Sequence, residues 1–173
     1  MLVTDDKLEQ LMERFIGRGR EALLPALWDV QTAYGHIDAE AVRKISHTLR
    51  VPEADIYGVI GFYTMYYNQP TGKKILRVCT SPSCAVLGGK DTLAGACAAL
   101  GVSAGEITAD GEYTVEPTEC VGLCDHAPAV LVSERGVGET LYGHVDDAEA
   151  FLAAQGDYHY DNNYESDTGV LLD

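Results

Sequence analysis

Two close pairs of cysteines constrain this 173-residue chain more than any other feature. Four residues separate Cys79 from Cys84, and three separate Cys120 from Cys124. The 35 residues between the pairs are enough for one helix and a returning strand. A fold that carries both pairs to one place would offer four thiolates to a single metal centre.

The composition is that of an ordinary globular protein. The hydrophobic fraction is 46%, and the length suits one core, or one core with a small helical appendage. No apolar run approaches the roughly 18 residues of a membrane span. The N-terminus lacks the basic start and apolar stretch of a signal peptide. We therefore expect a cytoplasmic protein, soluble or peripherally associated with a membrane complex, whose thiols stay reduced.

The charge is strongly negative, with 27 acidic against 12 basic residues and a formal net charge of −15. Such a chain repels nucleic acid and anionic lipid, so we expect neither nucleic-acid binding nor direct membrane insertion. The acidity suits docking to a more basic protein partner. It is equally compatible with a role in solubility alone.

Residues 1–68 have the pattern of a helical bundle. Apolar residues recur at helical spacing in four segments, and Asp38 is placed to cap the third helix. The second pair of helices could pass for a helix-turn-helix, but its last helix carries no Lys or Arg, which favours ordinary helix packing. The marker positions are Leu8, Leu11, Met12, Phe15 and Ile16 in the first helix, residues 21–33 for the second, residues 38–49 for the third, and Ile56, Val59, Ile60 and Tyr63 in the fourth.

The pattern changes after the turn-rich residues 68–72, and we expect a second domain over 73–155. It contains short strands and helices, with an Asp-Gly hairpin over 107–115 and a capping box over 145–149. The remaining expected elements are strands at 74–78, 129–133 and 140–143, a helix at 90–100 that ends at Gly101, and a helix from the capping box to about Ala154. The acidic tail, residues 156–173, is aperiodic, and we expect disorder unless a partner orders it.

The order of strand, helix and strand gives the two cysteine pairs a reason to meet. A crossover helix between two strands of one sheet usually makes the strands parallel, and their carboxyl ends then lie on the same side. Cys79 and Cys84 follow the first strand, and Cys120 and Cys124 follow the strand containing 113–115. We therefore expect both loops at one end of the sheet.

Four converging thiolates suit a [2Fe–2S] cluster best, because each of its two irons takes two thiolates. Structural zinc sites prefer pairs spaced by two residues, and a cubane cluster draws three ligands from one compact motif. Zinc and disulfide bonding remain alternatives. A thioredoxin-type dithiol is disfavoured, because no two cysteines are separated by two residues.

The neighbouring residues fit a cluster. Hydroxyls and glycines near the sulfurs would supply hydrogen bonds and close backbone approach, raising the reduction potential, whereas flanking carboxylates would lower it. These residues are Thr80, Ser81, Ser83, Gly88, Gly89 and Gly122, with Glu119 and Asp125 as the carboxylates. Cys97, inside a predicted helix, is interpreted as a packing residue rather than a ligand. His126 is interpreted as a nearby surface histidine, although Rieske centres use two histidines on one iron.

At these residues the chain resembles the thioredoxin-like [2Fe–2S] ferredoxins, and more narrowly the E subunits of the NADH-quinone oxidoreductases. The cluster loops VCTSPSCAVLG (78–88) and EPTECVGLCDHAP (116–128) carry the resemblance, as do LPALWDVQTAYG (24–35) and IYGVIGFY (56–63). The resemblance covers about residues 8 to 155. It implies an α+β chain, in which an N-terminal helical bundle is followed by a thioredoxin-like α/β domain with a mixed sheet.

The resemblance also implies one [2Fe–2S] cluster on Cys79, Cys84, Cys120 and Cys124. It implies a flavoprotein partner subunit that holds FMN and NADH, together with further iron–sulfur subunits. The chain itself shows no G-x-G-x-x-G after a strand, no P-loop and no convincing catalytic triad, so we expect no catalytic residue and an electron-transfer role. The alternatives are a structural zinc module that docks subunits and a small transcriptional regulator. The parent complex and the final acceptor stay open.

Overall fold

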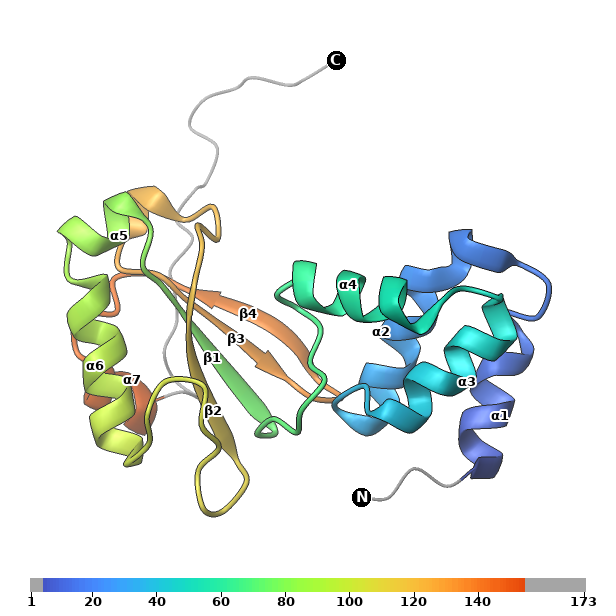
Figure 1. Cartoon of the computed structure of the whole chain (residues 1–173). Coiled ribbons are helices and arrows are strands. Elements are labelled where there is room, and N and C mark those ends of the chain that lie inside the picture. Colours follow the sequence, from blue (N-terminus) through green and yellow to red (C-terminus); the bar gives the residue numbers. More distant parts are fainter. Residues whose placement is uncertain (1–4, 155–173) are drawn as a thin grey trace, which may run out of the picture. The chain divides into compact units, whose positions relative to one another are not determined.

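The computed structural model describes residues 5–154 of the chain (Figure 1). These residues form two compact units. One consists of the residues up to 75 with 106–114 and 133–138, and the other of 76–105, 115–132 and the described residues from 139 onward.

The N-terminal helices form one apolar core, because each buries the stripe that its sequence spacing creates. They are α1 (Asp5–Glu13), a 3-10 helix (Gly19–Ala22), α2 (Leu23–Tyr34), α3 (Ala39–Leu49) and α4 (Glu53–Phe62). Asp38 caps α3 as expected, with the Ala41 N–H donating to its carboxylate at 2.8 Å. Buried members of the core include Leu8, Met12, Phe15, Leu27, Val30, Ile45 and Ile56.

Two expected helical faces end earlier than predicted. Helix α1 ends at Glu13. Phe15 therefore lies in the turn that follows the helix, where it is still buried, and Ile16 is 70% exposed. Beyond Glu13 the N–H groups of Phe15, Ile16 and Arg18 donate to carbonyls three residues back, so the chain tightens into turns around Gly17, which has a φ of +79°. At the end of α4, Ile60 is buried but Tyr63 lies outside the helix and is 38% exposed.

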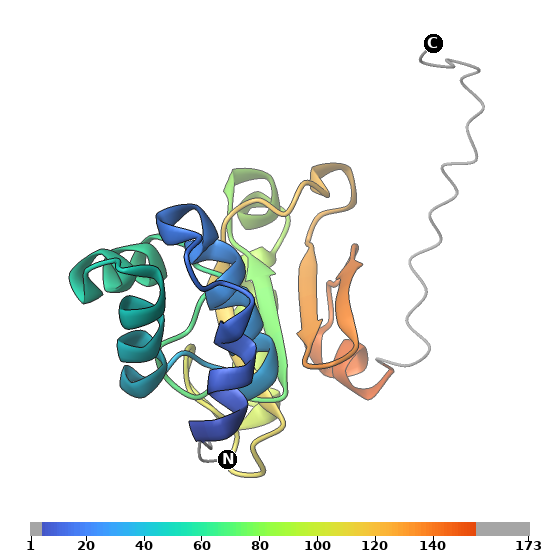
Figure 2. The ribbon, with the colours of Figure 1, turned by 90° about the vertical axis from the view of Figure 1, so that its right-hand side faces the viewer.

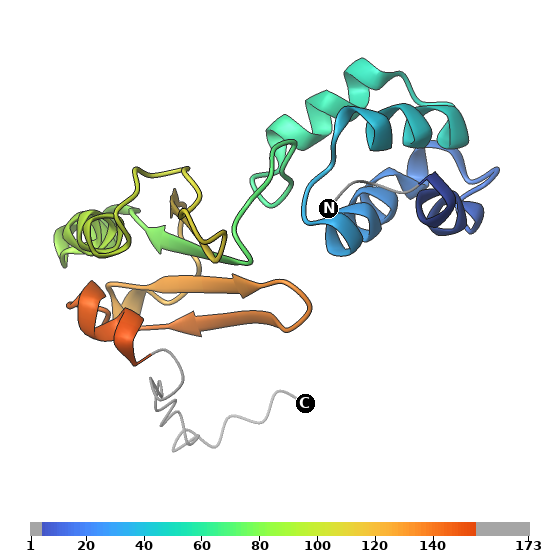
Figure 3. The same ribbon diagram turned by 90° about the horizontal axis from the view of Figure 1, so that it is seen from below.

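The sheet is mixed, with strand order β2-β1-β3-β4. Its strands are β1 (Lys74–Cys79), β2 (Tyr113–Thr118), β3 (Val130–Glu134) and β4 (Gly138–Tyr142). Figure 2 shows β1, β3 and β4 side by side, and Figure 3 shows the β3–β4 hairpin. The predicted α+β class with a mixed sheet is confirmed.

Backbone hydrogen bonds define the strand directions. The Lys74 N–H donates to the Glu112 carbonyl and the Thr80 N–H donates to the Thr118 carbonyl, so the partners advance together and β1 and β2 are parallel. By contrast, the Cys79 N–H donates to the carbonyl of Ala129, and residue 135 pairs with residue 73, so β1 and β3 are antiparallel. The crossover between β1 and β2 thus has the parallel geometry that the sequence predicts.

The helices of the sheet domain are α5 (Pro82–Val86), α6 (Gly89–Leu100) and α7 (Ala148–Ala153), and α6 and α7 lie side by side (Figure 1). Gly101 ends α6 in the left-handed conformation, as expected. The cap of α7 lies one residue later than the capping box predicts. Asp147, not Asp146, accepts the N–H groups of Glu149 and Ala150, each at 3.0 Å. Helix α5 was not predicted.

The expected hairpin over 107–115 is present only as a tight turn. Ile107 forms a single antiparallel bridge with Thr114, and no strand precedes β2 in this described segment. Side chains, rather than a second strand, accept the backbone N–H groups of this turn. The carboxylate of Asp110 accepts the Glu112 N–H at 3.0 Å, and the Thr108 hydroxyl accepts the Tyr113 N–H at 2.9 Å. The other expected hairpin, β3–β4, is confirmed.

A buried arginine of β1 forms ion pairs with carboxylates on two other strands of the sheet. Arg77 of β1 is 8% exposed, and its Nε lies 2.9 Å from a carboxylate oxygen of Glu116 on β2. Its Nη1 lies 3.3 Å from the carboxylate of Glu139 on β4. The paired carboxylates explain how an otherwise apolar strand accommodates a charge.

None of the helices within residues 5–154 has the length and apolar character needed to cross a bilayer.

Candidate metal centre

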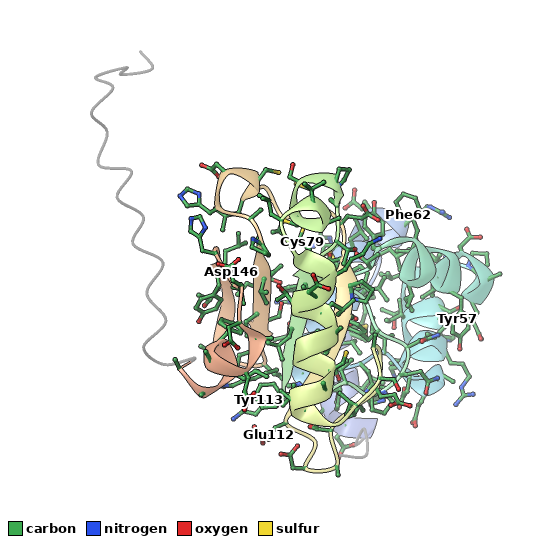
Figure 4. The ribbon with its side chains drawn as sticks, turned by 90° about the vertical axis from the view of Figure 1, so that its left-hand side faces the viewer. Tyr57, Phe62, Cys79, Glu112, Tyr113 and Asp146 are labelled. Carbon is green, nitrogen blue, oxygen red and sulfur yellow. The ribbon has the colours of Figure 1, made fainter. Side chains whose placement is uncertain are left out.

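The segments that follow β1 and β2 leave the same end of the sheet (Figure 1), and each cysteine pair lies where one of these strands ends. Cys79 is the last residue of β1 and Cys84 lies in α5, and both are about 1% exposed. Cys120 lies in the loop after β2 and Cys124 begins a 3-10 helix (Cys124–His126), and both cysteines are exposed. Because β1 and β2 are parallel neighbours, their loops share an end, as the sequence predicts. Figure 4 labels Cys79 next to α5.

The first loop is held in place by backbone contacts. Pro82 opens α5, and the Cys79 N–H donates to the Ala129 carbonyl at 2.9 Å. Helix α6 begins directly against the loop at Gly89. A Cβ at this position would lie 2.5 Å from the Cys79 carbonyl oxygen and 2.9 Å from that of Cys84. Only glycine fits here, so this residue fixes how closely α6 approaches the first cysteine pair.

The second loop brings its two sulfurs together. The Sγ atoms of Cys120 and Cys124 lie 3.3 Å apart, and the Gly122 N–H donates to the Cys120 Sγ at 3.4 Å. Gly122 has a φ of +86°, which turns the chain back between the cysteines. Two thiolates on one tetrahedral metal ion with bonds of about 2.3 Å lie about 3.8 Å apart. The second pair is therefore close to the spacing that one metal ion requires.

Electrostatics link the two pairs. Burial raises the pKa of Cys84, and the charges of Cys79 and Cys124 raise it further. The hydrogen bond between the Cys124 thiol and the Cys120 sulfur raises the pKa of Cys124, with a smaller contribution from Cys79. The pKa of Cys120 is lowered, chiefly by the Gly122 N–H. Thiolates from both loops thus influence each other, which requires them to lie near one another.

The four thiols nevertheless do not lie at the distances of a single set of metal ligands. Within residues 5–154, no three His, Cys, Asp or Glu side chains are grouped tightly enough to hold a metal ion. The donor chemistry still fits an iron–sulfur cluster, because four soft thiols occur in two pairs and charge in one loop affects the other. The structure brings each pair together and both pairs to one end of the sheet.

Of the hydroxyls predicted near the sulfurs, that of Ser83 acts on Cys124, where it opposes the rise in the pKa of this thiol. The other two have different partners. The Thr80 hydroxyl donates to the Thr118 carbonyl at 3.5 Å, and the Ser81 hydroxyl to the Glu119 carboxylate at 3.3 Å. Both join the first loop to the second, so they support the loops rather than the sulfurs.

His126 and Cys97 have other surroundings than the paired thiols. The Nδ1 atom of His126 lies 2.9 Å from the Asp125 carboxylate, and its hydrogen bond lowers the pKa of that carboxyl. The His126 ring also contacts the His144 ring, with centroids 5.1 Å apart. No sequence signal predicts this contact, because the two residues are far apart in the chain. Cys97 is half-buried in α6, and burial raises its pKa.

These pKa directions predict which thiol of the iron-free chain reacts first. Cys120 should be alkylated at lower pH than Cys97, because a lowered pKa leaves more thiolate at a given pH and a raised pKa leaves less. Iodoacetamide labelling at about pH 6–10, a range that brackets thiol pKa values, measures the alkylation of both cysteines when it is read by peptide mass spectrometry. Equal pH profiles would contradict the assignment.

The whole arrangement matches one family model. Residues 8–150 match the model described as thioredoxin-like [2Fe–2S] ferredoxin, which is most of the chain. The chain belongs to the thioredoxin-like [2Fe–2S] ferredoxin family. The resemblance noted in the sequence is thereby confirmed at the family level.

Three relatives are similar to the chain over most of their length. The chain is 31% identical to the NADH-quinone oxidoreductase E subunit 2 of Rhizobium meliloti, covering 87% of this chain and 89% of the relative. It is 37% identical to the NADH-quinone oxidoreductase E subunit of Pseudomonas aeruginosa, covering 69% and 72%. It is also 32% identical to the NADP-reducing hydrogenase subunit HndA of Solidesulfovibrio fructosivorans, covering 71% and 72%.

A solved structure agrees with the fold. An air-oxidized NAD+-reducing [NiFe]-hydrogenase matches with a TM-score of 0.62 and 26% identity, over 78% of this chain. The chain spans only 23% of the length of that hydrogenase chain.

Proposed function

We propose that this chain is an electron-transfer subunit that holds one [2Fe–2S] cluster on Cys79, Cys84, Cys120 and Cys124. The observation that carries the proposal is the meeting of the two cysteine loops at the carboxyl ends of the parallel strands β1 and β2. When bound, such a cluster supplies exchange of single electrons. The family match supports this class of cofactor.

The chain's own residues would make the two sides of the site unequal. Cys79 and Cys84 are buried against Ala127 and Ala129, which keeps water from the first pair. Cys120 and Cys124 are exposed, and Cys120 receives a hydrogen bond from the Gly122 N–H. Such donors favour negative charge on sulfur and raise the potential of a bound centre. The second pair would therefore form the more solvent-exposed side of a bound centre.

We place the chain in the NADH-oxidising or NAD-reducing module of a multi-subunit oxidoreductase. Support comes from the relatives, which are named as subunits of NADH-quinone oxidoreductases and of an NADP-reducing hydrogenase. The FMN- and NADH-binding steps would take place in a flavoprotein partner, with further iron–sulfur subunits beyond it, and this chain would not be catalytic alone. A cytoplasmic location, free or peripheral to a membrane complex, stays a prediction.

Anaerobic purification followed by metal and sulfide analysis tests this function. We expect about two irons and two labile sulfides per chain, with an absorption that bleaches on reduction. An iron-free chain that binds zinc and keeps its fold would overturn the proposal. It would favour the structural zinc module instead.

Exposed apolar residues beside the first loop suit contact with the flavoprotein. Val86 and Leu87 follow Cys84 closely and are 84% and 56% exposed. A second copy of this chain, with a formal charge of −15, would repel the first, which favours a different protein as the occupant. An electron donor must approach the site closely, so this surface lies where such a partner would dock.

Val86→Asp should weaken co-purification of the flavoprotein subunit about tenfold or more while leaving the iron content unchanged. The matched control is Val137→Asp, because Val137 of the β3–β4 turn is 77% exposed. Affinity capture of the co-expressed pair measures the effect. Equal losses for both variants would show that the added charge, rather than this surface, is responsible.

A further inference from the structure

The segment that leads from β4 to α7 presses against the second cysteine loop. A Cβ on Gly143 would lie 2.7 Å from the His126 Cβ, 2.8 Å from the His126 carbonyl oxygen and 3.2 Å from a Leu123 methyl carbon. Leu123 and His126 flank Cys124 on either side. Gly143 thus contacts the loop around one of the proposed ligands.

Glycine at this position is required by space rather than by backbone conformation. The φ of Gly143 lies outside the left-handed region, so an alanine could adopt the same backbone angles. The missing side chain is what allows the close approach. A methyl group here would force the loop outward, because the nearest atoms include the loop's backbone.

Hydrogen bonds hold the same segment on the loop. The His144 N–H donates to the His126 carbonyl at 2.7 Å, and the Val145 N–H donates to the Pro128 carbonyl at 3.0 Å. The rings of His126 and His144 also pack edge to face. These contacts fix the end of the second loop to residues 143–145.

The contacts continue to the first loop through one buried hydroxyl. Thr92 of α6 is 3% exposed, and its hydroxyl donates to the Val145 carbonyl at 2.8 Å and lies 3.2 Å from the Gly88 carbonyl. Gly88 adjoins Gly89, which rests against the carbonyls of the first pair. A continuous path of close contacts therefore joins the loop of Cys79 and Cys84 to the loop of Cys124.

We propose that Gly143 is a positioning residue. Residues 143–145, which Thr92 anchors, set the separation of the two cysteine loops. This separation determines how tightly the cluster is bound and its reduction potential. This inference rests on the proposed function. Its physical basis is that moving one loop changes the hydrogen bonds and the solvent exposure around the sulfurs, and both tune the stability and the potential of a bound cluster.

Gly143→Ala in the full-length, iron-loaded chain tests the inference, with Gly61→Ala as the matched control. Gly61 lies in α4, where an added Cβ meets nothing within 4 Å. Loss of iron to a chelator should be about tenfold faster or more in Gly143→Ala, and its reduced EPR signal and midpoint potential should shift. The Gly61→Ala chain should match the unchanged chain in all three measurements.

A second pair of variants keeps the test decisive if Gly143→Ala fails to fold. Thr92→Val removes the hydroxyl that joins the loops and should also speed iron loss, whereas Thr92→Ser keeps the hydroxyl and should restore the original rate. Iron loss and EPR signals unchanged in both Gly143→Ala and Thr92→Val would overturn the inference while leaving the proposed function intact. An unchanged chain that binds no iron would overturn the proposed function itself, and the inference with it.

Discussion

Cys120→Ala is expected to reduce bound iron from about two per chain to nearly none, whereas Cys97→Ala should leave the iron content unchanged. Cys120 lies 3.3 Å from Cys124 and accepts the Gly122 N–H, so its loss removes one thiolate of the exposed pair. Cys97 is half-buried in α6, and burial raises its pKa, as expected for a thiol used in packing. The two variants lose the same side chain at positions with different predicted roles.

Iron and labile-sulfide analysis of the two variants, purified anaerobically side by side, gives the comparison. Circular dichroism of both chains checks that each has folded. Loss of the cluster in Cys97→Ala alone would show that the ligand assignment is wrong. Retention of two irons by Cys120→Ala would show that Cys120 is no ligand.

Gly89→Ala should produce the second large effect, a destabilisation of about 1–3 kcal/mol. An added Cβ would lie 2.5 Å and 2.9 Å from the carbonyl oxygens of Cys79 and Cys84, so helix α6 or the loop must move. The atoms that it meets belong to the backbone, which yields less readily than a flexible side chain. The melting temperature should fall by roughly 2–12 °C, since each kcal/mol is worth about 2–4 °C at this chain length.

Gly58→Ala is the matched control for this prediction. Gly58 lies inside α4, and an added Cβ there meets nothing within 4 Å. The same substitution should therefore stabilise the chain by about 0.5–1 kcal/mol through helix propensity. Thermal unfolding followed by circular dichroism measures both variants. Equal destabilisation of the two would contradict the close contact at Gly89.

The sequence was sufficient to predict the topology around the site. A crossover helix between two neighbouring strands usually makes them parallel, and the two cysteine pairs begin where β1 and β2 end, so the sequence predicted that both pairs lie at one end of the sheet. The cap at Asp38 and the end of α6 at Gly101 were equally predictable, because each depends on a local signal of one residue. Such features need no knowledge of distant parts of the chain.

Contacts between distant segments could not be predicted in the same way. Gly143 follows β4 in the sequence, and only the folded chain shows that it lies against Leu123 and His126. The short helix α5 also escaped prediction, because five residues carry too little periodicity to identify a helix. Ile16 illustrates the opposite error, since its helical spacing continues past Glu13, where α1 ends.

EPR spectroscopy of the dithionite-reduced chain, with spin quantification, tests the central claim most directly. One [2Fe–2S] cluster on the four paired cysteines predicts about one unpaired spin per chain, for about two irons bound. Replacement of any one of Cys79, Cys84, Cys120 or Cys124 should abolish or alter the signal. An EPR-silent reduced chain that contains zinc in place of iron, with its fold intact, would contradict the account.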